Sequence, residues 1–135
     1  MPEQEKQSLA AIIIDDDPLV IRLFKRFFTK AGFRVETASD GQRGLELIQQ
    51  SKPDIVLLDL RLPVLDGFEV LKRIRQDEKT KQTPVVCFSG IGDRPGIAEE
   101  CKNLGAKDCI TKGSMSPDAV VKRILQFIGR DDIAL

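Results

Sequence analysis

Residues 54–63 read DIVLLDLRLP, and this stretch decides how the rest of the chain is interpreted. Four consecutive apolar residues, Ile55 to Leu58, lead straight into Asp59. A short apolar run without alternation is typical of a central strand in a parallel sheet, which is buried on both faces. Asp59 would then lie at the carboxyl end of that strand, where open α/β sheets bind ligands. Taken alone, Asp59 is better explained as a turn residue, so the ends of the other strands must decide.

The composition describes one domain without a strong overall charge. The chain has 135 residues, and its 21 basic residues balance 21 acidic ones, which argues against a nucleic-acid partner. No apolar run approaches the ~20 residues that a membrane span needs, so we expect no membrane partner. Histidine is absent, which excludes histidine catalysis and histidine metal ligands. Cys87 and Cys109 lie in apolar runs and are interpreted as small buried residues in a reducing compartment, which predicts a cytoplasmic protein.

Hydrophobic periodicity predicts five strands that alternate with five helices. The strands are expected at residues 10–14, 34–38, 55–58, 85–88 and 108–111, with the second at an edge of the sheet. This alternation predicts an α/β fold with a doubly wound, five-stranded parallel sheet that helices cover on both faces. Residues 1–8 are predicted to be a flexible tail, residues 9–129 the domain, and residues 130–135 a second tail.

Three of the predicted helices carry recognisable start signals or apolar faces. Asp17 and Pro18 open the first helix, whose buried face should consist of Val20, Leu23, Phe24, Phe27 and Phe28. The fourth helix is expected over residues 95–104, and Ser116 is expected to cap the last one.

Polar residues follow four of the predicted strands at the same edge of the sheet: Asp15 with Asp16, then Asp59, Ser89 and Lys112. Two carboxylates about 4 Å apart repel each other by roughly 4 kcal/mol at an effective dielectric near ~20. One lysine cannot neutralise three carboxylates, so the pocket requires a cation, and oxygen-rich sites with room for water suit Mg²⁺. Asp59 would then act as a nucleophile that forms an aspartyl phosphate, with the ammonium and hydroxyl groups stabilising the transferred phosphoryl oxygens.

These residues, in this order and at these separations, resemble the CheY-like receiver domain of two-component response regulators. The resemblance covers about residues 9–129 and rests on Asp15-Asp16, Asp59, Leu62-Pro63, Asp66-Gly67, Ser89-Gly90, Gly105-Ala106 and Lys112. It implies the flavodoxin-like (βα)5 fold with strand order 2-1-3-4-5. It also implies that Asp59 accepts the phosphoryl group, that Asp16 binds Mg²⁺ directly and Asp15 through water, and that the backbone carbonyl of Arg61 is a further ligand.

The same resemblance implies roles and partners for the remaining site residues. Ser89 would be the switch hydroxyl, and Lys112 would pair with the phosphoryl group. The phosphodonor would be a sensor histidine kinase or a phosphotransfer protein, and an unidentified downstream protein would receive the signal. We expect a stand-alone receiver, because no output domain follows residue 129. Its chemistry would be limited to self-phosphorylation from a phosphodonor and slow autodephosphorylation.

Four positions depart from the usual pattern of this family. Cys109 stands where an aromatic residue usually reports the switch, and Gly113 stands where a proline commonly follows the lysine. Arg61 and Ile91 place unusual bulk beside the phosphorylation site. Cys109 motivates an alternative, in which the domain is a binding module that acts largely independently of phosphorylation; the complete set of acids argues against it.

Two other classes of protein fit the sequence less well. A flavodoxin-type cofactor domain needs a phosphate-binding loop after the first strand, where residues 15–17 are three aspartates that would repel phosphate. A phosphatase of the haloacid-dehalogenase type needs a second acid at the position of Arg61.

Overall fold

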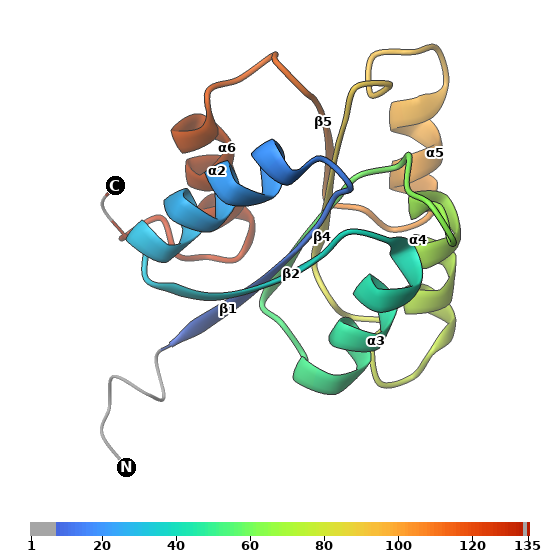
Figure 1. Ribbon diagram of the computed structural model, residues 1–135, viewed down its shortest axis with the longest axis horizontal. Coiled ribbons are helices and arrows are strands. Elements are labelled where there is room, and N and C mark those ends of the chain that lie inside the picture. Colours follow the sequence, from blue (N-terminus) through green and yellow to red (C-terminus); the bar gives the residue numbers. More distant parts are fainter. Residues whose placement is uncertain (1–7, 134) are drawn as a thin grey trace.

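The computed structural model describes residues 8–133 and 135, and it contains one five-stranded sheet (Figure 1). All neighbouring strands are parallel, and their order is β2-β1-β3-β4-β5. The predicted order is therefore confirmed, and each predicted strand is found to within one residue at either end. The strands are β1 (Leu9–Ile14), β2 (Phe33–Ala38), β3 (Ile55–Leu58), β4 (Val85–Ser89) and β5 (Asp108–Thr111). The tail predicted for residues 1–8 falls almost entirely outside the described residues.

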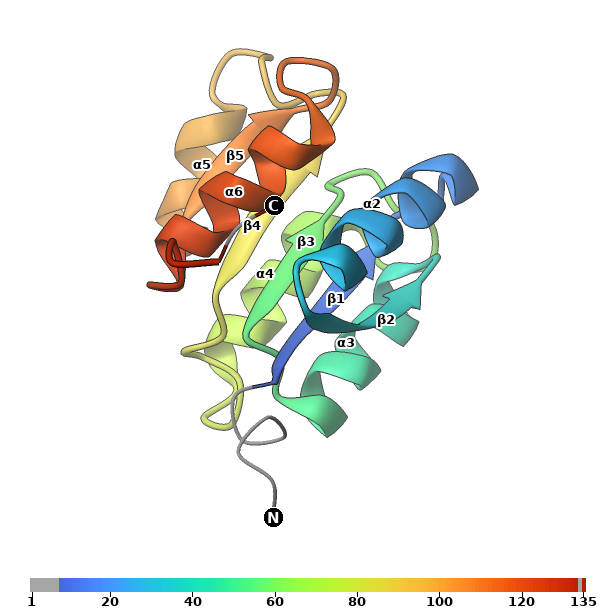
Figure 2. The ribbon, with the colours of Figure 1, turned by 90° about the vertical axis from the view of Figure 1, so that its left-hand side faces the viewer.

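Five helices cover the two faces of this sheet (Figures 1 and 2). They are α2 (Pro18–Lys30), α3 (Gly41–Ser51), α4 (Gly67–Gln76), α5 (Ile97–Asn103) and α6 (Pro117–Phe127). Helices α2 and α6 lie on one face, and α3, α4 and α5 lie on the other (Figure 1). None of the helices in the described part of the chain combines the length and the apolar character that crossing a membrane would require.

The fully apolar strands contribute side chains to the hydrophobic cores on both faces of the sheet. In β3, Val56 and Leu58 belong to the hydrophobic core under α3, α4 and α5, while Ile55 and Leu57 belong to the core under α2 and α6. All four of these side chains are at most 2% exposed. Successive residues of a strand point to opposite faces, so a strand that is covered twice has to be apolar throughout. The interpretation of residues 55–58 as a central strand is therefore confirmed.

Aspartates begin three of the helices. The side chains of Asp17, Asp40 and Asp66 accept hydrogen bonds from the backbone N–H groups of the first turns of α2, α3 and α4. The expected cap at Ser116 differs, because its side chain makes no such bond. The Ser116 hydroxyl instead donates to the exposed carboxylate of Asp118, which lowers the pKa of that carboxyl group.

Two other expectations for the helices are corrected. Helix α5 begins at Ile97 rather than at residue 95, because Gly96 has a left-handed φ of 82° and residues 91–96 form turns. On α2, Phe24 and Phe28 are buried as predicted, but Leu23 is 40% exposed. Leu23 lies about 100° round the helix axis from Phe24, so it falls at the rim of the stripe that contacts the sheet.

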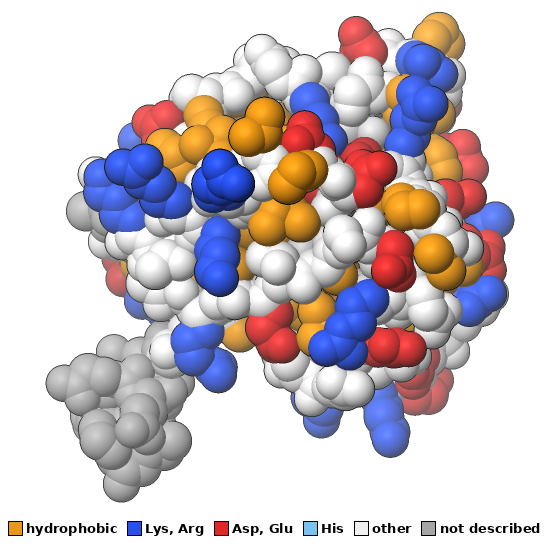
Figure 3. All heavy atoms as spheres, viewed as in Figure 1, with side chains coloured by type: hydrophobic (Ala, Val, Ile, Leu, Met, Phe, Trp, Pro, Cys, Tyr) orange, Lys and Arg blue, Asp and Glu red, His pale blue; other side chains and the backbone are white. Residues whose placement is uncertain are grey.

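The exposed residues of α2 form a small mixed surface. Leu19 is 67% exposed, and together with Arg22, Leu23 and Arg26 it lines a shallow hollow, which we call the α2 patch. Figure 3 shows apolar side chains beside basic ones over this helix. Exposed leucines therefore lie among the basic residues on the solvent-facing side of this helix.

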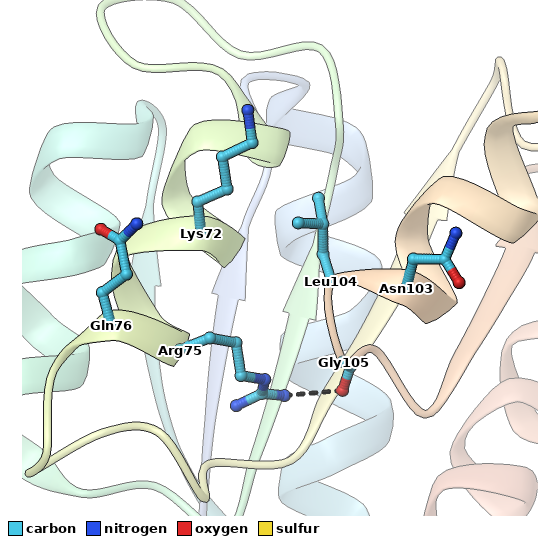
Figure 4. Close-up of a pocket in the computed structure, with 6 residues that line it drawn as sticks. All are labelled: Lys72, Arg75, Gln76, Asn103, Leu104 and Gly105. Atoms are coloured by element: carbon cyan, nitrogen blue, oxygen red, sulfur yellow. Dashed lines mark hydrogen bonds between the residues drawn. The ribbon is translucent and has the colours of Figure 1, made fainter.

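The guanidinium group of Arg75 connects α4 to the two segments that precede β4 and β5 (Figure 4). Arg75 of α4 donates hydrogen bonds to the backbone carbonyls of Gly105, Thr83 and Lys81 at 2.8, 2.8 and 2.9 Å. It lines a hollow of about 370 Å³ between α4 and the end of α5. Burial lowers the pKa of Arg75. One side chain thus holds the loop before β4 and the turn before β5 against α4.

Replacing Arg75 with methionine is expected to destabilise the domain by about 1–3 kcal/mol, because three backbone carbonyls, one of them in a part-buried hydrogen bond, lose a charged donor. Arg73→Met is the matched control on the same helix. Arg73 forms an exposed ion pair with Glu69 at 3.2 Å, and such pairs contribute less than about 1 kcal/mol. Urea unfolding measures both values. Equal losses in the two variants would contradict a special role for Arg75.

Candidate functional site

Two neighbouring strands end in carboxylates at the same point of the sheet. Ile14 of β1 pairs with Leu58 of β3, so the residues that follow them, Asp15 and Asp59, emerge side by side. The backbone N–H of Asp59 donates to the carbonyl of Ile14 at 2.9 Å, which extends the ladder by one residue. From β1 the chain turns to β2 on one side, and β3 lies on the other, so this is the point where the strand order reverses.

The three predicted acids converge there. One carboxylate oxygen from each of Asp15, Asp16 and Asp59 lies within 4.8 Å of the other two. We call this group the acidic pocket. Asp15 and Asp59 are 1% and 5% exposed, whereas Asp16 is exposed to solvent. A site with two buried carboxylates and one exposed carboxylate therefore opens to solvent through Asp16.

Lys112 bridges the two buried carboxylates. Its Nζ lies 2.8 Å from Oδ2 of Asp15 and 3.2 Å from Oδ2 of Asp59. The lysine follows β5 directly, and its backbone N–H donates to the carbonyl of Ser89 at 3.0 Å. A lysine separated from Asp59 by more than fifty residues is thus brought to the same edge by the pairing of β4 with β5.

The ionisation of these groups reflects the balance of burial and charge. Burial raises the pKa of Asp15, although the hydrogen bonds from Lys112 and from the N–H of Asp17 oppose this effect. Burial alone would lower the pKa of Lys112, but its hydrogen bond with Asp15 and the charges of Asp15 and Asp59 outweigh burial and raise the pKa. The lysine is therefore held as an ammonium group, and the pocket keeps an excess of negative charge.

Ser89 ends β4 with an unpartnered hydroxyl. Its side chain is fully buried, and among the described residues its Oγ has no hydrogen-bond partner. A buried polar atom without a partner costs about 1–3 kcal/mol, so such atoms are rare unless they serve a ligand. Ser89 pairs with Thr111, directly before Lys112. An orphaned donor thus lies at the edge that also carries the acidic pocket.

Arg61 and Ile91 line a hollow beside the pocket, together with Asp16 and residues of the loop after β3. The hollow has a volume of about 490 Å³. The backbone N–H of Arg61 donates to Oδ1 of Asp59 at 3.3 Å, while its side chain is exposed. Ile91 is only 8% exposed and packs into the core under α4. Its side chain therefore forms an apolar wall rather than a free flap.

Gly113 and Cys109 are the two departures on β5 and its loop. Gly113 has a φ of 88°, a left-handed conformation that favours glycine, so this residue suits the turn after Lys112. Cys109 pairs with Cys87 across the sheet and is partly exposed. It leaves a small thiol on the surface between α5 and β5.

Gly67 shapes the site in a way that the sequence reading missed. A Cβ atom at this position would meet the carbonyl oxygen of Asp59 and the Cα of Leu60. The neighbouring Asp66 caps the start of α4, and the Gly67 N–H donates to the carbonyl of Leu60 at 2.9 Å. The start of α4 is therefore pressed against the backbone that carries Asp59. The signal in the sequence was a glycine at the first helical position, where glycine has no advantage for the helix itself.

Gly67→Ala is expected to cost about 1–3 kcal/mol, because the new methyl group overlaps backbone atoms that cannot rotate away. It should also slow any reaction of Asp59, since relief of the overlap moves the backbone of that residue. Gly90→Ala is the control, because a Cβ there meets no atom within 4 Å. Thermal melts and a labelling assay on both variants test this. An unchanged Gly67→Ala protein would show that the loop yields without cost.

The fold and site together define an open, doubly wound α/β domain with an acidic, lysine-bearing pocket at its switch point. Residues 11–125 match the response regulator receiver domain. The chain therefore belongs to the receiver domain family of two-component response regulators. The resemblance inferred from the sequence motifs is confirmed.

Curated relatives agree with this assignment. The chain is 36% identical over 123 residues to the DNA-binding dual master transcriptional regulator RpaA of a Synechocystis species, covering 90% of this chain and 49% of that protein. It is 41% identical over 104 residues to a protein-glutamate methylesterase/protein-glutamine glutaminase of Trichodesmium erythraeum, covering 75% of this chain and 29% of that protein. The chain thus spans half or less of the length of these relatives.

Solved structures share the fold. The chemotaxis response regulator CheY4 of Vibrio cholerae superposes with a TM-score of 0.80 at 28% identity, covering 90% of this chain and 98% of that one. A chain from the CheX-CheY complex of Borrelia burgdorferi, which contains BeF3 and Mg²⁺, has a TM-score of 0.80 at 27% identity, covering 88% of each chain.

Proposed function

We propose that Asp59 accepts a phosphoryl group from a phosphohistidine donor in a Mg²⁺-dependent reaction, and that the phosphorylated domain signals through altered binding to a partner. The observation that carries this proposal is the convergence of three carboxylates and one lysine at the switch point. A structural role explains this group poorly, because three acids beside one ammonium group repel each other.

The residues present fit a magnesium ion. Asp15, Asp16 and Asp59 supply hard oxygen donors, and the backbone carbonyl of Arg61 is the further ligand that the family resemblance implies. When bound, the ion would supply positive charge for the carboxylates and for an incoming phosphoryl group. The related CheX-CheY complex contains Mg²⁺, which supports the same assignment here.

Different residues of the site would carry out different parts of the phosphoryl transfer. A carboxylate oxygen of Asp59 attacks phosphorus, the bond from phosphorus to the donor imidazole nitrogen breaks, and the imidazole leaves with that electron pair. The Arg61 N–H orients Asp59 through Oδ1. Lys112 exchanges part of its contact with Asp59 for a phosphoryl oxygen, and Ser89 donates its unpartnered hydroxyl to another.

The proposal includes surfaces for partners. The α2 patch combines exposed leucines with arginines, which suits docking of the kinase or phosphotransfer protein, as the family resemblance implies. The balanced charge supports the absence of a nucleic-acid contact by this domain. The free cysteines, which suit a reducing compartment, support a cytoplasmic location. Loss of phosphate should be slow, because Ile91 offers an attacking water no hydrogen bond.

Labelling of the unaltered protein tests the proposal. The protein is incubated with acetyl phosphate in Mg²⁺ or in excess chelator, and its intact mass is measured. One added phosphoryl group is expected in Mg²⁺ only, and borohydride reduction followed by peptide mapping should place it on Asp59. A label on another residue, or labelling in chelator, would overturn the assignment. A protein that takes up no label but still binds a partner would favour the alternative binding module that Cys109 suggests.

A further inference from the structure

The three cysteines of the chain come from three different elements and meet in one place. Cys87 of β4 and Cys109 of β5 are register partners, so their side chains project from the same face of the sheet. Cys101 lies on α5, the helix that covers this face. Cys87 and Cys101 belong to one buried core, and Cys109 packs against it. The three thiols are close enough to influence one another's pKa.

The geometry favours one pair over the others. Neighbouring strands lie about 4.8 Å apart, which exceeds the usual Cβ–Cβ separation of a disulfide, about 3.8 Å. The flanking ladder pairs hold Cys87 and Cys109 at the strand spacing. Cys101 is less constrained, because α5 has seven residues and no side-chain cap at its start. Cys109 is partly exposed, whereas Cys87 and Cys101 are both fully buried, so a small oxidant reaches this cluster through Cys109 and meets Cys101 beside it.

The thiols also differ in acidity. Hydrogen bonding from Cys87, with a further contribution from Cys109, lowers the pKa of Cys101 to about 7. Burial, together with the neighbouring Cys101, raises the pKa of Cys109 to about 12. Thiolates, not thiols, react with peroxides, so Cys101 is the residue prepared to react.

We propose that Cys101 and Cys109 form a reversible disulfide when the protein encounters a peroxide. The Cys101 thiolate attacks one peroxide oxygen, the O–O bond breaks, and the departing hydroxide takes up a proton to leave as water. The resulting sulfenic acid is attacked by the Cys109 sulfur, which loses its proton. The S–O bond breaks and a second water leaves. Two thiols and one peroxide become one disulfide and two waters.

This bond would couple α5 to β5 by a covalent link. Three residues after Cys109, the same segment carries Lys112 of the acidic pocket. The inference goes beyond phosphoryl acceptance and does not depend on it. It gives the domain an oxidant-responsive site at the position where the family usually carries an aromatic residue.

Counting thiols tests the proposal directly. The protein is treated with hydrogen peroxide, unfolded, labelled with a maleimide and weighed. Loss of two of its three reactive thiols, reversed by dithiothreitol, is expected for the unaltered protein. Cys87→Ala should still lose two, because both partners remain. Cys101→Ala and Cys109→Ser should form no disulfide, and peptide mapping should identify the link between residues 101 and 109.

The controls separate this result from other outcomes. Cys109→Ser changes a partly exposed side chain, so it keeps the test informative even if Cys101→Ala fails to fold. A disulfide that includes Cys87, a link only between two copies of the chain, or three thiols that all remain reactive would each overturn the proposal. Thiol counts do not require phosphorylation, so failure here leaves the proposed function of Asp59 untouched, and the converse also holds.

Discussion

Asp59→Asn should reduce labelling by acetyl phosphate to background in saturating Mg²⁺. The amide keeps the size and the position of the side chain, including an oxygen that can accept from the N–H of Arg61 at the 3.3 Å contact. It lacks the anionic oxygen that forms the bond to phosphorus. Since the side chain is 5% exposed and packed, the substitution should leave the fold in place, which circular dichroism can check.

Asp66→Asn is the matched control for this experiment. Asp66 lines the hollow beside the acidic pocket, but its carboxylate caps α4 by accepting from the N–H of Glu69 at 2.9 Å. Asparagine is nearly as good a cap as aspartate, so both stability and labelling should be preserved. If Asp59→Asn kept its label, or if both variants lost it, phosphorylation would not belong to Asp59.

Lys112→Met should destabilise the protein by about 2–4 kcal/mol in chelator, because two buried carboxylates lose their shared counter-charge. We expect a loss near the lower end of what breaking a buried ion pair costs, because the lysine side chain is 24% exposed. Added Mg²⁺ should recover much of the loss and should raise the midpoint of unfolding more in the variant than in the unaltered protein. Lys107→Met, at an exposed position, should change stability by less than about 0.5 kcal/mol.

The difference in stability between Lys112→Met and the unaltered protein should change with pH in a defined direction. The pKa of Lys112 is raised in the folded state, so its contribution is fully present below the ordinary value of 10.5 and is lost as the pH rises through the folded pKa. The pKa of Asp15 is also raised, so the cost of burying its charge disappears as the pH falls toward the ordinary value of 3.8. The variant should therefore be weakest, relative to the unaltered protein, between these two limits. A constant difference across that range, or no rescue by Mg²⁺, would contradict the role given to Lys112.

Local sequence determined the strands and most of the helix starts, because the physics that specifies them is local. An apolar run such as residues 55–58 has to be covered on both sides, and an aspartate before a helix satisfies free backbone amides wherever the helix later packs. The same locality explains the errors. Leu23 was assigned to the buried face of α2 from spacing alone, but it is exposed. Ser116 was expected to cap the last helix, but its hydroxyl bonds to the Asp118 carboxylate instead.

The candidate site could be predicted because the carboxyl ends of parallel strands lie at the same edge of a sheet. Asp15, Asp59 and Lys112 each follow an apolar run, so sequence order and strand direction brought them together before any distance was known. The close approach of Gly67 to the backbone of Asp59 was not predictable in this way, since it depends on how α4 is seated. The unpartnered hydroxyl of Ser89 was likewise invisible, because satisfaction of a hydrogen bond is a property of the surroundings.

Tertiary structure alone decided how the cysteines are related. In the sequence, Cys87, Cys101 and Cys109 are three separate residues, two in strands and one in a helix. Pairing of β4 with β5 sets two of them side by side, and the packing of α5 on that face adds the third. The sequence by itself determined which segments are strands and which residues end them. Contacts between side chains of distant segments depend on strand register and helix placement, which the buried core as a whole selects.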